Sequence, residues 1–91
     1  MSYELGFRDE ALREWKKLDA NTRGQFSKKL AERLENPKVP AAKLRRSTDR
    51  YKIKLRGVGY RLVYQVRDKE MLVLVIAIGR RDEVYDVVEQ R

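Results

Sequence analysis

The sequence predicts a small α+β protein, a single domain over residues 1–91 with the element order β-α-α-β-β-β-α. Three observations predict it. Residues 9–35 repeat apolar side chains at helical spacing, and residues 51–78 hold runs that alternate or stay apolar as strands do. A chain of 91 residues also has no room for a second core. We therefore expect a mainly antiparallel sheet, an N-terminal helical hairpin packed on one face, and a short C-terminal helix.

The first two elements are predicted to be a short strand and a helix. Residues 3–7 alternate in the pattern of a strand, and Asp9 then offers a candidate N-cap for the helix that follows. Three large apolar residues share one face of this helix: Leu12, Trp15 and Leu18. That face is expected to pack on the core.

A second helix is expected to begin at Asn21 or Thr22, because Thr22 and Gln25 have the spacing of a capping box. Its apolar stripe consists of Phe26, Leu30 and Leu34. The helix should end at Asn36, since a residue that precedes proline disfavours helical backbone angles. The short join between the two helices predicts an antiparallel hairpin.

Three strands are predicted after a connection without strong periodicity at residues 37–50. They are expected at residues 51–56, 60–66 and 71–78. The last of them is apolar at every position, which is typical of a central strand that is covered on both faces. Gly79 is expected to end it, and residues 82–90 fit a short amphipathic helix.

The composition excludes several kinds of chemistry. The chain has no cysteine and no histidine, so disulfides, thiolate or imidazole metal sites and the usual general base at neutral pH are all ruled out. We expect no cofactor and no metal. The N-terminus lacks the apolar run of a signal peptide, and no segment approaches the roughly 20 apolar residues of a membrane span. A cytoplasmic protein without a membrane partner is expected.

The net charge of +8 is concentrated in the middle of the chain. Between residues 43 and 67, nine lysines and arginines accompany a single acidic residue, Asp49, whereas the flanking segments nearly balance. Such a density predicts a polyanionic partner, and nucleic acid is favoured over a membrane because no basic amphipathic helix accompanies the segment. A solvated surface is the alternative.

The basic residues of this segment are predicted to share one face of the sheet. Alternation in residues 51–56 places Lys52, Lys54 and Arg56 opposite an apolar face. Arg61 of the next strand is expected beside them, and Arg80 and Arg81 follow the end of the central strand. Like charges on neighbouring strands destabilise a sheet, so the cluster is better explained by phosphate binding than by folding.

A cationic patch of this kind could also cleave RNA, because RNA supplies its own nucleophile, the 2′-hydroxyl. An enzyme must remove that proton, stabilise the charge on the phosphate oxygens and assist the departing 5′-oxygen. A lysine can act as the base only when it is neutral, and with a pKa near 10.4 only about one in 2,500 is neutral at pH 7. Neighbouring cations and partial burial lower a lysine pKa, and this is the expectation for Lys52 and Lys54.

Three stretches together resemble a known family. They are Tyr51-Lys52-Ile53-Lys54-Leu55-Arg56, Gly59-Tyr60-Arg61-Leu62-Val63-Tyr64 and Ile78-Gly79-Arg80-Arg81 with a tyrosine after them. They closely resemble the RelE toxins of bacterial toxin–antitoxin systems, and the likeness covers nearly the whole chain. It implies a metal-independent endoribonuclease, an mRNA interferase, that inhibits translation. Such toxins enter the ribosomal A site and cut mRNA by 2′-hydroxyl attack, which leaves a 2′,3′-cyclic phosphate and a 5′-hydroxyl.

The resemblance implies a role for each matching residue. Lys52 and Lys54 match the paired lysines that supply the general base and phosphate stabilisation, without settling which one is the base. Arg61 matches the arginine that holds the scissile phosphate, and Arg81 the one at the leaving group. Tyr85 matches a tyrosine that stacks on the substrate, although packing against its valine neighbours is the alternative. RNA contacts are expected from the other basic residues: Arg45, Arg46, Arg50, Arg56 and Arg80.

The resemblance also implies partners. These are a cognate RelB-like antitoxin, the 70S ribosome with mRNA in its A site, and operator DNA, bound only by the toxin–antitoxin complex as it represses its own operon. We expect the antitoxin to cover the basic face or to move the helix that carries Tyr85. Two other functions stay open. They are a non-catalytic toxin on the same fold, of the kind that poisons DNA gyrase, and a plain RNA- or ribosome-binding module.

Overall fold

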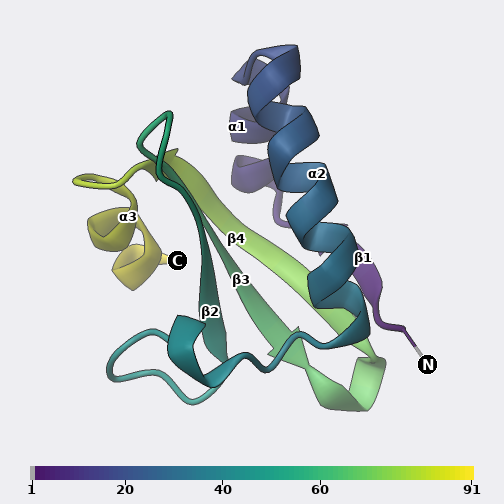
Figure 1. Ribbon diagram of the computed structural model, residues 1–91. Coiled ribbons are helices and arrows are strands. Elements are labelled where there is room, and N and C mark those ends of the chain that lie inside the picture. The colour runs from purple at the N-terminus through teal and green to yellow at the C-terminus, as the bar shows by residue number, and fades with distance from the viewer. Residues whose placement is uncertain (1) are drawn as a thin grey trace.

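The computed structural model describes residues 2–91, so that Met1 lies outside the described residues. Within them one four-stranded sheet is combined with three α-helices, in the predicted order and the predicted α+β class (Figure 1). The elements are β1 (Glu4–Phe7), α1 (Asp9–Lys17), α2 (Ala20–Glu35), β2 (Arg50–Leu55), β3 (Tyr60–Arg67), β4 (Leu72–Arg80) and α3 (Val84–Gln90).

The strands lie in the order β1-β4-β3-β2. β4 is central as predicted, pairing antiparallel with β3 and parallel with β1. A bulge shifts the register, because Val63 pairs with Ala77 while Tyr64 pairs with Val75, leaving Ile76 as the extra residue. The prediction that Gly79 ends this strand is wrong. β4 continues through Arg80 because Arg61 and Tyr60 of β3 pair with Gly79 and Arg80.

One face of the sheet carries the main core. Tyr51, Ile53 and Leu55 of β2 are buried there, as the alternation predicted. Phe26 and Leu30 of α2 pack against them, and Ala11 and Leu18 of α1 contribute to the same cluster. α1 itself lies along β4, whereas α2 lies nearest β2.

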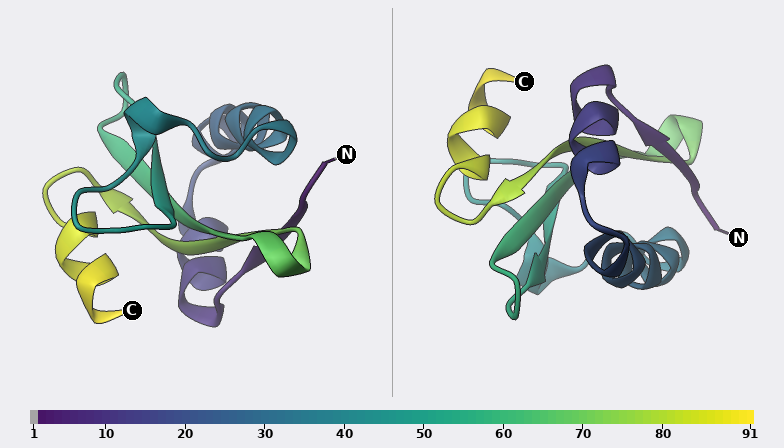
Figure 2. Two further views of the ribbon diagram at one scale, coloured as in Figure 1. Left: turned by 90° about the horizontal axis from the view of Figure 1, so that it is seen from below. Right: turned by 90° about the horizontal axis from the view of Figure 1, so that it is seen from above.

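The opposite face is covered by α3. Val84 and Val88 of this helix form a second apolar cluster with Val63 of β3 and Ala77 of β4. Figure 2 shows α2 and α3 on opposite sides of the twisted sheet. This packing is important for the site. The side chains of β2 that point away from the main core, among them Lys52, emerge on the sheet face that α3 covers.

Both predicted helix starts are wrong by one or two residues. Arg8, not Asp9, occupies the N-cap of α1, so Asp9 lies in the first turn, where a carboxylate interacts favourably with the helix dipole. α2 begins at Ala20 because the Asp19 side chain accepts hydrogen bonds from the backbone N–H and the hydroxyl of Thr22. Thr22 is therefore a buried residue inside the helix rather than its cap. These bonds hold the pKa of Asp19 below its ordinary value.

The connection between α2 and β2 is ordered by local structure. It contains a short 3-10 helix at Pro40–Ala42 and a single bridge between Lys43 and Tyr51. Arg46 has a φ of 63°, in the left-handed region that few residues with a β-carbon adopt. None of the helices within residues 2–91 has the length and apolar character needed to cross a membrane.

Candidate active site

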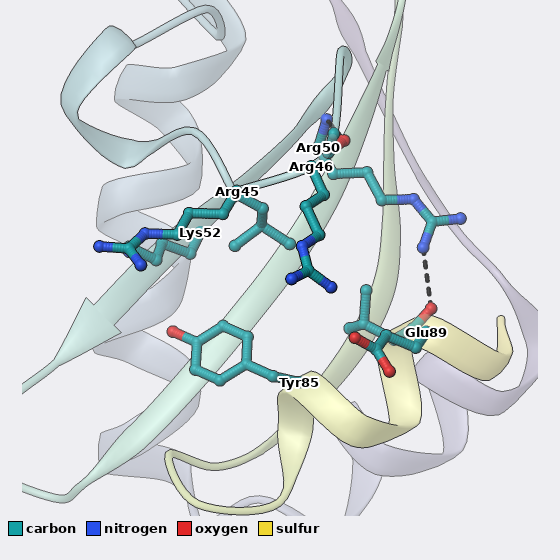
Figure 3. Close-up of a pocket in the computed structure, with 9 residues that line it drawn as sticks. Arg45, Arg46, Arg50, Lys52, Tyr85 and Glu89 are labelled. Carbon is teal, nitrogen blue, oxygen red and sulfur yellow. Dashed lines mark hydrogen bonds between the residues drawn. The ribbon is translucent and has the colours of Figure 1, made fainter.

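A cavity of about 560 Å³ lies between the connection, β2 and α3. We call it the basic cavity, since four of the residues that line it are cationic. Figure 3 shows Arg46 pointing toward the space between Tyr85 and Glu89, with Arg45 and Lys52 on the side of the Tyr85 hydroxyl. Its lining consists of Leu44, Arg45, Arg46, Ser47, Arg50, Lys52, Tyr85, Val88 and Glu89.

Lys52 is the lysine that lines this cavity. It lies in β2 opposite Val63, so its side chain emerges beside the apolar cluster on which α3 packs. The side chain is half-buried. Burial is the largest cause that lowers the pKa of Lys52, and the charges of Lys54, Arg61 and Arg45 lower it further. A lysine in this position is neutral more often than an exposed one.

Arg61 lies next to the lysines, as the alternation predicted. It pairs directly with Lys54 across β2 and β3, so the two side chains project from the same face. Arg61 is half-buried, and its buried Nε–H has no hydrogen-bond partner among residues 2–91. Its Nη1 reaches only the backbone carbonyl of Tyr60, at 3.4 Å. An unsatisfied buried donor on a cation is suited to an incoming anion.

The arginines of the connection are placed in two different ways. Arg45 and Arg46 are exposed at the rim of the basic cavity. Arg50 is half-buried, and its Nη1 donates to the backbone carbonyl of Val88 at 2.9 Å (Figure 3). The Oγ of Ser47 accepts from the Arg50 backbone N–H, also at 2.9 Å. Arg50 therefore ties α3 to the start of β2 as well as lining the cavity.

Tyr85 is half-buried, with its ring packed on the second apolar cluster and facing the cavity. Part of this side chain thus packs as one alternative predicted, and the rest lines the cavity, so that stacking on a substrate stays a prediction. Arg91, which follows the C-terminal end of α3, anchors this helix. Its guanidinium donates to the Glu14 carboxylate at 2.9 and 3.1 Å and to the backbone carbonyl of Ile76 at 3.1 Å. Glu14 also accepts from the Ile78 backbone N–H at 3.0 Å.

Arg80 and Arg81 are not brought into the basic cavity. Arg80 is exposed and lies over the ring of Tyr60, with 5.6 Å between its guanidinium carbon and the ring centroid. The Arg81 side chain is also exposed, and its backbone N–H donates to the carbonyl of Gly59 at 3.0 Å. Gly59 has a φ of 68°, which its lack of a β-carbon permits, so the β2–β3 turn fixes the backbone at Arg81.

The remaining two predicted residues, Lys54 and Arg56, are exposed and line a separate hollow on the outer side of β2, to which Lys52 also contributes. Arg61 lies on β3 beside Lys54, and the rest of the predicted set divides over three places: the basic cavity, the outer side of β2, and the end of β4 beside the β2–β3 turn.

Glu89 was missed by the sequence analysis. It is the one carboxylate that lines the basic cavity, four residues after Tyr85. Residues four apart share a helix face, so the spacing of Tyr85 and Glu89 could have revealed it. Within residues 2–91, acidic side chains do not gather in any group of three that could hold a metal ion.

Comparisons with known proteins point to one family. The sequence model of the ParE toxin of type II toxin–antitoxin systems matches residues 5–85. The chain is 52% identical to the mRNA interferase toxin RelE of Escherichia coli K12, over 100% of this chain and 98% of the relative.

Solved structures agree with this. A free form of the E. coli toxin RelE with two arginines replaced by alanine superposes with a TM-score of 0.92 and 50% identity, covering 100% of this chain and 98% of that one. The toxin in the intact E. coli RelBE toxin–antitoxin complex gives a TM-score of 0.85 and 53% identity, covering 87% and 96%.

Proposed function

This chain belongs to the RelE toxins, within the ParE toxin family of type II toxin–antitoxin systems, and we propose that it is a ribosome-dependent endoribonuclease. It would cut mRNA in the ribosomal A site and so inhibit translation. The observation that carries this proposal is a half-buried Lys52 inside a cationic cavity that also presents Tyr85, a setting that lowers the pKa of Lys52. The curated name of the E. coli relative, an mRNA interferase toxin, supports the same activity.

In the proposed reaction, Lys52 is the general base. Its neutral amine takes the proton of the 2′-hydroxyl, the 2′-oxygen bonds to phosphorus, and the bond from phosphorus to the 5′-oxygen breaks. The products are a 2′,3′-cyclic phosphate and a 5′-hydroxyl. Between the two lysines, we assign the base to Lys52 because it is half-buried beside three cations, whereas Lys54 is exposed.

The other residues stabilise charge or position the substrate. Lys54 and Arg61 project from the same face and would hold the scissile phosphate, using the unpaired Nε–H of Arg61. Arg81 would stabilise the departing 5′-oxygen, which takes up a proton from water, and Lys52 would release the proton it accepted to the solvent. Tyr85 would stack on a nucleobase at the cavity, a geometry that aligns the 2′-hydroxyl with phosphorus. Phosphates of the flanking RNA would be contacted by Arg45, Arg46, Arg50, Arg56 and Arg80.

The same membership leads us to propose the partners. A RelB-like antitoxin would inactivate the protein in the cytoplasm, since solved relatives include a RelBE toxin–antitoxin complex. It would do so by covering the basic face or displacing α3. The resulting complex would bind operator DNA and repress its own operon, with the antitoxin supplying the DNA-binding element.

The deciding experiment uses ribosomes programmed with mRNA and an empty A site. They are mixed with the wild-type protein, with the Lys52→Ala plus Lys54→Ala variant, or with Lys16→Ala plus Lys17→Ala, which removes two exposed lysines from α1. Cut ends are mapped by primer extension, and the products are assayed for the cyclic phosphate. Cleavage by the wild type and the α1 variant, but not by the β2 variant, is expected.

Absence of cleavage by the wild type would overturn the proposal. If the wild type then still bound ribosomes, the basic face would serve only to bind RNA. If it bound neither ribosomes nor RNA, a non-catalytic toxin on this fold would be favoured.

A further inference from the structure

A second basic hollow, of about 320 Å³, lies on the outer side of β2 between this strand, α2 and the 3-10 helix that follows α2. We call it the outer hollow. Five of its nine lining residues are cationic and none is acidic, although both signs of charge are common elsewhere on the surface. The lining consists of Lys29, Arg33, Val39, Ala41, Ala42, Lys52, Ile53, Lys54 and Arg56.

One wall of the outer hollow is rigid. The Nη1 of Arg33 donates to the backbone carbonyl of Lys52 at 3.1 Å and to the hydroxyl of Tyr64 at 2.9 Å. The Tyr64 hydroxyl in turn donates to the carbonyl of Pro37 at 2.6 Å. The guanidinium is thereby fixed with its charge uncompensated by any carboxylate among the lining residues. Concave surfaces lined by one sign of charge concentrate their electric field, so this geometry attracts an anion.

The outer hollow adjoins the basic cavity, because Lys52 lines both. A single phosphate bound near Lys52 would not fill two hollows. Nucleic acids, however, carry a regular series of phosphates, so RNA that passes over Lys52 can place phosphates on either side of it. Lys29 and Arg56 are exposed at the outer hollow and free to adjust to such a group.

We propose that the outer hollow binds one backbone phosphate of the RNA that surrounds the protein in the A site. Lys29 of α2 would contact this phosphate directly. This inference rests on the proposed function. Lys29 belongs to a helix that none of the predicted catalytic residues occupies, so it can be tested without disturbing them. The phosphate can belong to the mRNA or to ribosomal RNA, which present the same chemistry.

The test compares Lys29→Gln with Lys28→Gln. Both lysines are exposed neighbours on α2, and the two variants have the same net charge, but Lys28 does not line the outer hollow. Single-turnover cleavage on programmed ribosomes is measured against toxin concentration at several salt concentrations. Lys29→Gln is expected to raise the half-saturating concentration on the order of three- to tenfold relative to Lys28→Gln, with the maximal rate unchanged. The slope of log affinity against log salt should fall by about 0.7, the value for one phosphate on a single strand.

Equal behaviour of the two variants would overturn the subsite while leaving the nuclease intact. If the wild type does not cleave at all, the proposed function fails, and the same pair of variants is compared for ribosome binding by fluorescence. A loss of affinity in Lys29→Gln alone would still support the phosphate subsite, and equal affinities would refute it.

Ribosomes without mRNA identify the source of the phosphate. If Lys29→Gln weakens binding to these ribosomes as much as to programmed ones, the phosphate belongs to ribosomal RNA. If the loss is seen only with mRNA present, it belongs to the message.

Discussion

At the scale of single residues, Lys52 shows how the environment of a lysine can favour its neutral form, which the proposed reaction needs because the chain has no histidine. Partial burial and three like charges both disfavour its protonated form. The cations that would bind the substrate therefore also tune the group that would activate it. The proposed reaction would thus account for like charges placed side by side on β2 and β3 despite their mutual repulsion.

The cleavage rate at saturation should rise with pH, with a slope near one in log units, and level off at the lowered pKa of Lys52, because the neutral amine is the active form. Arg45→Gln removes one of the charges that lower this pKa, so the inflection should move to higher pH. Arg46→Gln should leave it in place, since Arg46 is not among those charges. The pH profile of single-turnover cleavage checks this, and equal inflections in the two variants would contradict it.

Arg46 provides a second test at this scale, because its left-handed φ of 63° is unfavourable for a residue with a β-carbon. Glycine usually destabilises a protein relative to alanine, but here Arg46→Gly should be more stable than Arg46→Ala by about 1 kcal/mol. Both variants lose the same guanidinium at the basic cavity, so their activities should fall equally. Chemical denaturation measures the stabilities, and a more stable alanine variant would show that this backbone angle imposes no cost.

At the scale of elements, α3 is a helix of seven residues, too short to be stable on its own. Its apolar side packs on β3 and β4. Arg50 donates to the backbone carbonyl of Val88 near the C-terminal end of the helix, and Arg91 donates to the carbonyl of Ile76 at the β4 bulge. The position of Tyr85 therefore depends on contacts made by β2, β3, β4 and α1. An antitoxin that competed for these contacts could release the helix.

Glu14→Gln should loosen α3, because the ion pair with Arg91 is lost while the amide oxygen can still accept from the Ile78 N–H. The free energy of unfolding should fall by about 1–3 kcal/mol, as for other partly buried charged hydrogen bonds. Amide hydrogen exchange should accelerate in α3 more than in β3. Glu32→Gln, at an exposed position of α2, serves as the matched control and should change neither quantity. Uniform acceleration across the sheet would show that Glu14 stabilises the whole fold rather than α3.

At the scale of the whole molecule, the asymmetric charge determines which partners approach and where. The excess of cations in residues 43–67 lies on the connection, β2, the β2–β3 turn and β3, next to two hollows lined by cations. Long-range attraction to RNA or to an acidic protein is thus directed to the same side as the candidate site.

An acidic RelB-like antitoxin should consequently bind in a salt-dependent manner. Its affinity should fall by at least about tenfold between about 50 and 300 mM salt, because exposed charge pairs are screened over this range. Isothermal titration at three salt concentrations measures it. An affinity independent of salt would show that binding is dominated by apolar contacts, and the basic face would then be free in the complex.

The sequence alone determined the fold class, the strand alternation and the shared face of Lys52, Lys54 and Arg61, because these follow from local periodicity. It determined the helix starts less well, since Asp9, Asp19 and Thr22 are all competent caps and the choice depends on packing.

Only the tertiary structure decided which of the basic residues meet. The basic cavity depends on a hydrogen bond between Arg50 and Val88, 38 residues apart, and α3 depends on an ion pair between Glu14 and Arg91, 77 residues apart. No local pattern encodes contacts of this separation. The outer hollow arises in the same way, because Lys29 and Arg33 approach β2 only when α2 packs on the sheet.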